Sequence, residues 1–300
     1  MMTDVKVAAT LIDDQRSPIA SPLVRVSVRD AMRPGVVMCL PGDHLRRIAA
    51  LMVGHRIHAV MLAPGDRPTP LILNDLEFVR AALRRPRASA ADVAREPVDT
   101  VCVDATLDEA VAMMAERYVT HVLATDPGTD APVGVVSSFD VAATFGREAP
   151  RPARVRWPAA VRRPLITDPL LQTRVGDVMH PGLATCAADA PLATVARTMA
   201  DRRIHCVAIA GIAPSSRHLT FGLITGMDLV RALHRGAHAE PAAMIAASAP
   251  VAVGADETLA RAAELMVEHD TSHVVVAGNS GMPVGMVSSF DIAQVLTTGG

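Results

Sequence analysis

Residues 132–142 read PVGVVSSFDVA and residues 283–293 read PVGMVSSFDIA, so the same stretch occurs twice with two substitutions. A weaker copy, FGLITGMDLV, covers residues 221–230, and a degenerate copy, LILNDLEFV, covers residues 71–79. In chain order, the first and second copies are 63 residues apart, the third and fourth are also 63 apart, and the two pairs are offset by 151 residues. Repetition at a fixed period predicts four copies of one structural unit, arranged as two tandem pairs.

The same helical pattern occurs once in every repeat. A leucine is followed by small or aliphatic residues at the third and fourth positions and by methionine at the seventh, which is the spacing of one helix face. The four matches are Leu45, Ile48, Ala49 and Met52; Leu107, Ala110, Val111 and Met114; Leu192, Val195, Ala196 and Met199; and Leu259, Ala262, Ala263 and Met266. Helix starts are expected at Asp43, at Thr106 with Glu109 as a capping box, at Asp189 with Pro191, and at Asp256.

Short β-rich runs follow these helices. They are HAVML (58–62), HVLAT (121–125), HCVAI (205–209) and HVVVA (273–277). Loops rich in Gly, Pro and Asp come next, and the repeated motif then supplies a further strand that turns into a second helix. The sequence therefore predicts an α/β fold of four β-α-β-β-α repeats in two pairs. One repeat is too small to cover its own sheet, so we expect pairing within each half of the chain.

Composition limits the class of protein. Half of the residues are hydrophobic, yet no apolar run approaches the ~18 residues that a membrane span needs. The first residues, MMTDVKVAATLIDDQ, carry acidic side chains where a signal peptide would be apolar, so we expect a cytoplasmic protein without a membrane partner. A net charge of −2 gives no electrostatic case for nucleic acid as the main partner. The four cysteines form no CxxC pair and are expected to be free core thiols.

Two stretches lie outside the repeats. A lead-in over residues 1–23 shows no clear period and is expected to be poorly ordered. A linker over residues 147–172 is dense in Pro and Arg and is expected to be stiff and extended. A solvated linker is favoured over one whose arginines contact nucleic acid or an acidic partner. The four repeats, called units 1 to 4 below, are expected over residues 24–84, 88–146, 173–235 and 241–297.

The pieces of each repeat carry a family resemblance. In unit 3, DVMHPGLATC (177–186), the helix from Leu192, the strand after His205 and GLITGMD (222–228) have the order and spacing of a CBS domain, and all four units resemble it. The resemblance implies two tandem CBS pairs, or Bateman modules, each packed sheet to sheet with pseudo-twofold symmetry. Two such modules commonly form a disc, within one chain or between chains, so an intramolecular disc and a homodimer are both open.

The resemblance also implies ligand-binding residues. In CBS domains that bind adenosine-containing ligands, a G-h-x-[ST]-x-x-D motif places its hydroxyl at a phosphate and its carboxylate, with two acceptor oxygens, at the two ribose hydroxyls. The residues implied for ribose are Asp140, Asp228 and Asp291, those for phosphate are Ser137, Thr225 and Ser288, and those for close approach are Gly134, Gly222 and Gly285. Weaker contacts to the ligand or its base are implied for Thr100, Thr185, His121, His205 and His273.

Two alternatives compete with this assignment. [ST]-x-x-[DE] at a helix start is also a capping box, although capping boxes prefer Glu or Gln where three copies have Asp. The recurring histidines, including His58, are more often partly buried structural residues than ligand contacts. Unit 1 has Leu71, Asn74 and Glu77 at the Gly, Ser/Thr and Asp positions, so we expect its site to be empty or altered. The sites of units 2 and 3, which have a threonine before the first strand, are expected to be the most complete.

Neither a catalytic constellation nor a metal-ligand cluster is evident, so the chain is not expected to be an enzyme or to hold a metal. The first hypothesis is a stand-alone regulatory sensor that binds AMP, ADP, ATP or S-adenosylmethionine between paired units and transmits occupancy to an unidentified regulated protein. The second is a ligand-free interaction scaffold in which the S-x-x-D motifs only cap helices. A third, weaker hypothesis is a binder of nucleic acid or an acidic partner through the arginines of residues 151–163.

Overall fold

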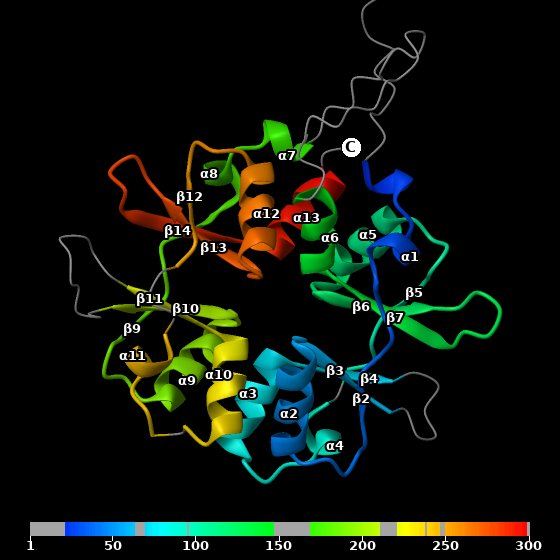
Figure 1. Ribbon diagram of the computed structural model, residues 1–300, viewed down its shortest axis with the longest axis horizontal. Helices are drawn as coiled ribbons and strands as arrows, with labels where there is room; N and C mark the ends of the chain where they lie inside the picture. Colours follow the sequence, from blue (N-terminus) through cyan, green and yellow to red (C-terminus); the bar gives the residue numbers. More distant parts are fainter. Residues whose placement is uncertain are drawn as a thin grey trace, which may run out of the picture.

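The computed structural model arranges the chain as four α/β units in a ring (Figure 1). Residues 1–21 of the lead-in and residues 147–168 of the linker lie outside the described residues, and the described ends of both segments are helical. The lead-in ends in a 3-10 helix whose Leu23 is fully buried, and the linker ends in a helical turn whose Leu170 is also buried. The arginines of residues 151–163 lie outside the described residues. The structure describes residues 22–63, 70–94, 96–146, 169–210, 221–237, 239–246 and 250–298.

Each unit repeats one order of elements, strand, helix, strand, strand and helix, which confirms the β-α-β-β-α prediction. In every unit the middle strand runs parallel to the first strand and antiparallel to the third. Units 1 and 2 comprise β2 Met38–Cys39, α2 Leu45–His55, β3 Ala59–Leu62, β4 Leu71–Asn74 and α3 Asp75–Arg84, then β5 Thr100–Cys102, α5 Leu107–Arg117, β6 His121–Thr125, β7 Pro132–Ser137 and α6 Ser138–Gly146. Units 3 and 4 comprise β9 Thr185–Ala187, α9 Leu192–Arg202, β10 Cys206–Ala210, β11 Gly222–Thr225 and α10 Gly226–Arg235, then β12 Ala252–Gly254, α12 Leu259–Glu268, β13 His273–Ala277, β14 Pro283–Ser288 and α13 Ser289–Thr298.

The segment that leads each unit packs on the other unit of the same module. β1 (Arg33–Pro34) lies at the start of unit 1, before β2, but pairs with β7 of unit 2, and β8 (His180–Pro181) lies at the start of unit 3, before β9, but pairs with β14 of unit 4. In the opposite direction, α4 (Ala90–Val93) leads unit 2, but its first amide donates a hydrogen bond to the carbonyl of Asp43 in unit 1 (2.7 Å). The two units of a module are therefore interlocked. The other short elements are η1 Pro22–Arg25, α1 Val28–Ala31, α7 Pro169–Gln172, α8 Val175–Val178 and α11 Ala242–Ile245.

The long helices form the contact between the two modules. Unit 1 packs on unit 3 through α2, α3, α9 and α10, and unit 2 packs on unit 4 through α5, α6, α12 and α13 (Figure 1). Each contact has its own apolar core, in which the Leu/Ala/Met stripes of the facing helices are buried. Within each module the sheets meet in a smaller cluster, around Met61 and Leu123 in the first module and around Cys206 and Val275 in the second. Two modules of one chain thus build the disc, while a homodimer stays a prediction.

Two further findings bear on the class of protein. Within the described stretches, no helix is long and apolar enough to cross a bilayer. The four cysteines are free thiols, and three of them, Cys39, Cys102 and Cys186, lie in the first strands of their units. Burial raises the pKa of Cys39 to about 11 and that of Cys206 to about 12, so both groups are protonated and unreactive at neutral pH.

Candidate functional site

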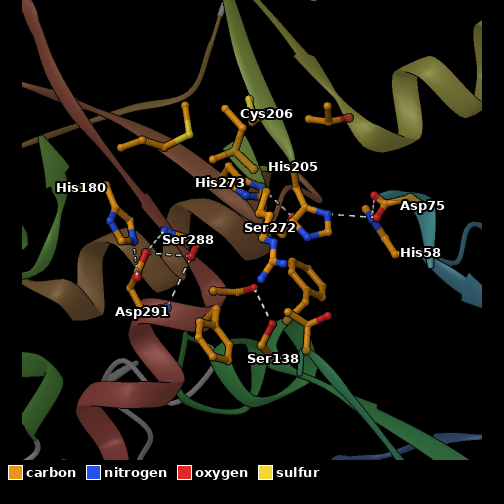
Figure 2. A pocket seen from close by; sticks show the side chains of 18 of the residues that line it. His58, Asp75, Ser138, His180, His205, Cys206, Ser272, His273, Ser288 and Asp291 are labelled. Carbon is orange, nitrogen blue, oxygen red and sulfur yellow. Dashed lines mark hydrogen bonds and ion pairs between the residues drawn. The ribbon is translucent and has the colours of Figure 1, made fainter. Parts of the chain in front are cut away.

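A cavity of about 770 Å³ lies where side chains of all four units converge (Figure 2). Its wall includes the motif hydroxyls of units 2, 3 and 4 and the four recurring histidines. Of the three motif aspartates, all of which the structure describes, Asp291 lines this cavity and Asp140 and Asp228 do not. Thr100 and Thr185 are exposed at the starts of β5 and β9, away from the cavity wall. The sequence therefore singled out part of the cavity's polar lining, and the units contribute to it unequally.

In unit 4, each oxygen of the Asp291 carboxylate has its own partner. Oδ2 accepts hydrogen bonds from the backbone N–H and the hydroxyl of Ser288, both at 2.7 Å, and so caps α13. Oδ1 accepts a hydrogen bond from Nε2 of His180 at 3.0 Å, as Figure 2 shows at one end of the cavity. The carboxylate is buried, whereas the His180 side chain is 77% exposed. An exposed imidazole thus hydrogen-bonds to the oxygen that the cap leaves free.

Unit 2 has the same arrangement of hydrogen bonds, with an arginine in place of the histidine. Oδ2 of Asp140 accepts hydrogen bonds from the backbone N–H of Ser137 (2.9 Å) and from its hydroxyl. Oδ1 accepts a hydrogen bond from Nε of Arg33 at 2.8 Å. The Arg33 guanidinium also lies over the ring of Phe139, 5.8 Å from its centroid. The Asp140 carboxylate is therefore held by the ion pair with Arg33 and by the helix cap together.

In units 1 and 3 the motif residues cap their helices as well. Oδ2 of Asp228 accepts hydrogen bonds from the backbone N–H and hydroxyl of Thr225 (2.9 and 2.7 Å), and Oδ1 pairs with Arg231 on the same helix (3.0 Å). Asn74 and Glu77 form a reciprocal capping box at the start of α3. Every copy of the motif is therefore a helix cap, which agrees with the capping alternative. In units 2, 3 and 4 the cap uses Oδ2 of the aspartate, and a basic side chain hydrogen-bonds to Oδ1.

Two of the motif glycines are required by the protein's own backbone. A Cβ atom on Gly285 would lie 2.5 Å from the carbonyl oxygen of His180, and one on Gly134 would lie 2.7 Å from that of Arg33. These are the points at which β8 pairs with β14 and β1 pairs with β7 in antiparallel ladders. Gly222 is buried opposite Ile209 in the β10–β11 ladder. The close approach at Gly134 and Gly285 is thus made by the leading strands.

The recurring histidines fall into two classes, which corrects their treatment as one repeated position. His121 and His273 are strand residues that face Ser137 and Ser288 across the ladder, whereas Ala59 and Cys206 hold that place in units 1 and 3. His58 and His205 stand one residue earlier, where units 2 and 4 have Thr120 and Ser272. The run of letters beginning with His looks identical in all four units, so this offset becomes visible only through the strand register.

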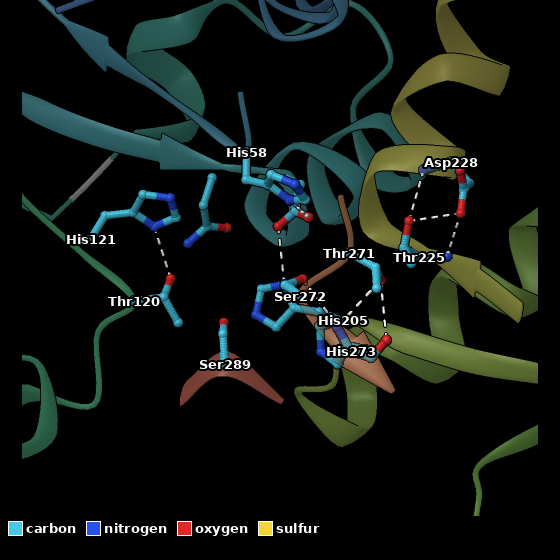
Figure 3. A network of polar contacts seen from close by, with 12 residues as sticks. His58, Thr120, His121, His205, Thr225, Asp228, Thr271, Ser272, His273 and Ser289 are labelled. Carbon is cyan, nitrogen blue, oxygen red and sulfur yellow. Dashed lines mark hydrogen bonds and ion pairs between the residues drawn. The ribbon is translucent and has the colours of Figure 1, made fainter. Parts of the chain in front are cut away.

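Sequence reasoning missed Asp75, the residue after the Asn74 helix cap. Its carboxylate is nearly fully buried and accepts hydrogen bonds from Nδ1 of His205 at 3.0 Å and from Nδ1 of His58 at 3.4 Å (Figure 2). Figure 3 shows the two histidines, His58 and His205, in the same polar network. Burial alone would raise the pKa of Asp75, but the charges and hydrogen bonds of His205 and His58 hold this pKa well below its usual range. Asp75 therefore links the first module, which holds His58, to the second, which holds His205.

The positions equivalent to Asp75 explain why it fits. They are Ser138, Gly226 and Ser289, each of which follows its helix cap. Ser138 and Ser289 are both buried, and their hydroxyls form a hydrogen bond of 3.0 Å between units 2 and 4. Between units 1 and 3, a Cβ atom on Gly226 would lie 2.5 Å from Oδ2 of Asp75. A serine–serine contact on one side is thus replaced by an aspartate–glycine contact on the other.

Acid is expected to destabilise the protein through His121 and His273. Burial, followed by the charge of His58, lowers the pKa of His121 to about 4, and burial, followed by the charge of His205, lowers that of His273 to about 3. Unfolded histidine binds its proton at about pH 6.5. Between about pH 6.5 and pH 4 the unfolded state therefore holds more protons than the folded state, so the free energy of unfolding decreases as the pH is lowered. Urea unfolding at pH 7, 6, 5 and 4.5 measures this decline.

The control for the acid experiment is His121→Gln/His273→Gln. Without the two imidazoles, the decline between pH 6.5 and 4.5 is expected to be shallower than in the wild type. Burial would lower the pKa of His205, but Asp75 raises it, so this group contributes stability below about pH 6.5 that is lost as the pH rises. It does not add to the acid loss. Equal declines in the wild type and the double variant would contradict this assignment.

No group of three or more potential metal ligands occurs among the residues that the structure describes. A family model described as CBS domain matches residues 90–146, 175–235 and 243–298, which together exceed half of the chain. No curated protein matches the chain. The matched segments fall in units 2, 3 and 4.

Two solved structures with TM-scores above 0.5 share the fold, and a third was found over a shorter part of the chain. Protein MJ1225 from Methanocaldococcus jannaschii, described as a proposed archaeal homologue of γ-AMPK, has a TM-score of 0.68 at 15% identity and covers 90% of this chain and 99% of its own. An uncharacterized conserved protein from Pyrococcus horikoshii has a TM-score of 0.56 at 14% identity and covers 90% of this chain and 100% of its own. The CBS domain protein PAE2072 from Pyrobaculum aerophilum, solved complexed with AMP, is 23% identical with a TM-score of 0.36, over 43% of this chain and 100% of its own.

Proposed function

The chain belongs to the CBS domain family, and from this premise we propose that it is a regulatory protein that binds an adenosine-containing ligand at the unit 4 end of the central cavity. The observation that carries the proposal is that Asp291 is buried, faces the cavity and has one oxygen outside its helix cap. The ligand is AMP, ADP, ATP or S-adenosylmethionine. This choice of unit 4 replaces the expectation that units 2 and 3 hold the most complete sites.

The residues around Asp291 suit the parts of such a ligand. The carboxylate accepts hydrogen bonds from the two ribose hydroxyls, and the ligand takes the place of His180 at Oδ1. Ser288 and the first turn of α13, which is a ten-residue helix, face an anionic group. The apolar wall near Leu183 and Met286 is suited to the base. His273, with Nδ1 hydrogen-bonded to Ser272, presents its other nitrogen for a phosphate.

In this proposal, a ligand bound in the cavity acts on a partner protein by changing how the two modules contact each other. Side chains of all four units line the cavity, and Asp75 hydrogen-bonds histidines of both modules beside it. A ligand that prefers one arrangement of the two modules shifts the protein toward that arrangement. A regulated protein that binds the same arrangement is then coupled to the ligand, and the coupling is reciprocal. In this proposal the chain is a sensor and performs no catalysis of its own.

Thermal unfolding with AMP, ADP, ATP, S-adenosylmethionine and GTP, compared with isothermal titration, tests the proposal. An adenosine ligand at about 100 times its dissociation constant is expected to stabilise the native state by about 2.7 kcal/mol. Asp291→Asn keeps the size of the side chain but removes the charge, and it is expected to abolish this stabilisation. The matched control is Asp228→Asn, which changes a motif carboxylate that does not line the cavity.

The outcomes separate the two functions. Stabilisation by one adenosine ligand that Asp291→Asn removes and Asp228→Asn retains supports the sensor. Binding that is lost in Asp228→Asn instead would move the site to unit 3. A folded wild type that responds to none of the five compounds would contradict ligand binding. The interaction scaffold would then lead, since every copy of the motif is already satisfied as a helix cap.

A further inference from the structure

The two modules place different basic side chains at one equivalent position. Arg33 and His180 each follow the methionine of a short leading helix, stand in the strand that joins the partner unit, and donate a hydrogen bond to Oδ1 of a motif aspartate. The aspartates, Asp140 and Asp291, also correspond and are both buried. The two carboxylates accept the same set of hydrogen bonds, so the basic side chain is the main difference in their immediate contacts.

Arg33 and His180 differ in how firmly they hold the carboxylate. Arg33 is permanently charged, its side chain is 49% exposed, and its guanidinium stacks over Phe139. His180 carries charge only when protonated, has no ring contact among the described residues, and is 77% exposed. A charge-assisted hydrogen bond is stronger than a neutral one. A ribose therefore displaces His180 more easily than it displaces Arg33.

The position of the cavity agrees with this difference. His180 and the two residues after it line the cavity, whereas Arg33 and Asp140 do not. In Figure 2, His180 and Asp291 lie together at one end of the pocket. The Asp291 carboxylate is thus reached from the cavity once the imidazole moves aside. At Asp140 the guanidinium fills the corresponding place.

We propose that the residue at this position selects which motif aspartate accepts a ligand. His180 is a displaceable stand-in for the ribose at Asp291, and Arg33 is a permanent one that keeps Asp140 closed. The protein then has one open site and one closed site at these two equivalent positions. This inference rests on the proposed function, because it assumes that an adenosine ligand binds at Asp291.

Variants that exchange Arg33 and His180 test the inference in isothermal titrations with AMP, ADP, ATP and S-adenosylmethionine. His180→Arg is expected to weaken binding at Asp291 at least about tenfold, because a charged and stacked partner replaces a solvated imidazole. Arg33→His is expected to open a second site, and Asp140→Asn in that background is expected to close it again. The double exchange is expected to bind one ligand, now at Asp140.

His180→Ala provides an independent measurement that leaves the fold of the leading strand untouched. Removal of the competing hydrogen bond is expected to tighten binding about threefold to tenfold. Weaker binding in His180→Ala would show that the imidazole holds the ligand, and it would overturn the inference. So would unchanged affinity and stoichiometry in both exchange variants. A wild type that binds none of the four compounds would instead refute the proposed function, on which the inference depends.

Discussion

Gly226→Ser is expected to lower the free energy of unfolding by about 2–4 kcal/mol, because overpacking a core costs about 1–3 kcal/mol and the displaced Asp75 loses hydrogen bonds as well. The added Cβ atom would lie 2.5 Å from Oδ2 and 2.8 Å from Cγ of Asp75. Asp75 is buried and held by His58 and His205, so a shift of its carboxylate breaks those hydrogen bonds. Urea unfolding followed by circular dichroism measures the loss.

The double variant Asp75→Ser/Gly226→Ser copies the contact that the other half of the protein already uses. Ser138 and Ser289 form this contact with a hydrogen bond of 3.0 Å. The double variant is expected to be more stable than the sum of the two single changes by about 1–3 kcal/mol, which is the usual size of a coupling between touching residues. Additive effects would show that Asp75 and Gly226 do not depend on each other.

Gly285→Ala is expected to cost about 2–3 kcal/mol, because the new methyl group overpacks a backbone contact that cannot move far. It would lie 2.5 Å from the carbonyl oxygen of His180 and 2.8 Å from Sδ of Met179. The expected result is separation of β8 from β14, seen as faster amide exchange near residues 179–183. The same change moves His180 away from Asp291.

The control for both glycine variants is Gly54→Ala, in α2. A Cβ atom at Gly54 meets no atom within 4 Å, and alanine in a helix is more favourable than glycine by about 1 kcal/mol. This variant is therefore expected to stabilise the protein slightly. A similar loss in Gly54→Ala and Gly285→Ala would show that backbone flexibility, and not the contact with β8, accounts for the result.

The sequence predicted those parts of the fold that depend on neighbouring residues. The Leu/Ala/Met spacing identified the first long helix of each unit, and Thr106 caps its helix with Glu109 as expected. The expected starts at Asp43 and Asp256 were off by a residue or two, because His44 and Thr258 are the caps. Such patterns are local, since helix geometry relates residues only three or four positions apart.

The rest of the site depends on contacts between residues far apart in the chain. Arg33 lies 107 residues from Asp140, His180 lies 111 residues from Asp291, and Asp75 lies 130 residues from His205. A repeat comparison aligns each unit with the others but does not show which units touch. The exchange of leading segments was missed for the same reason. Asp75 carried one usable signal, which is a charged residue where the other repeats have serine or glycine.

The exchanged leading strands also bear on how such a gene can grow. A duplication that copied unit 2 alone would leave out β1, which completes the sheet of unit 2 and lies at the start of unit 1. The new copy would have an open edge beside Gly134, with nothing to cover it. A duplication of the whole 151-residue pair carries both leading segments with it. The pair, and not the single repeat, is thus the smallest segment of this gene whose product arrives with its sheets complete.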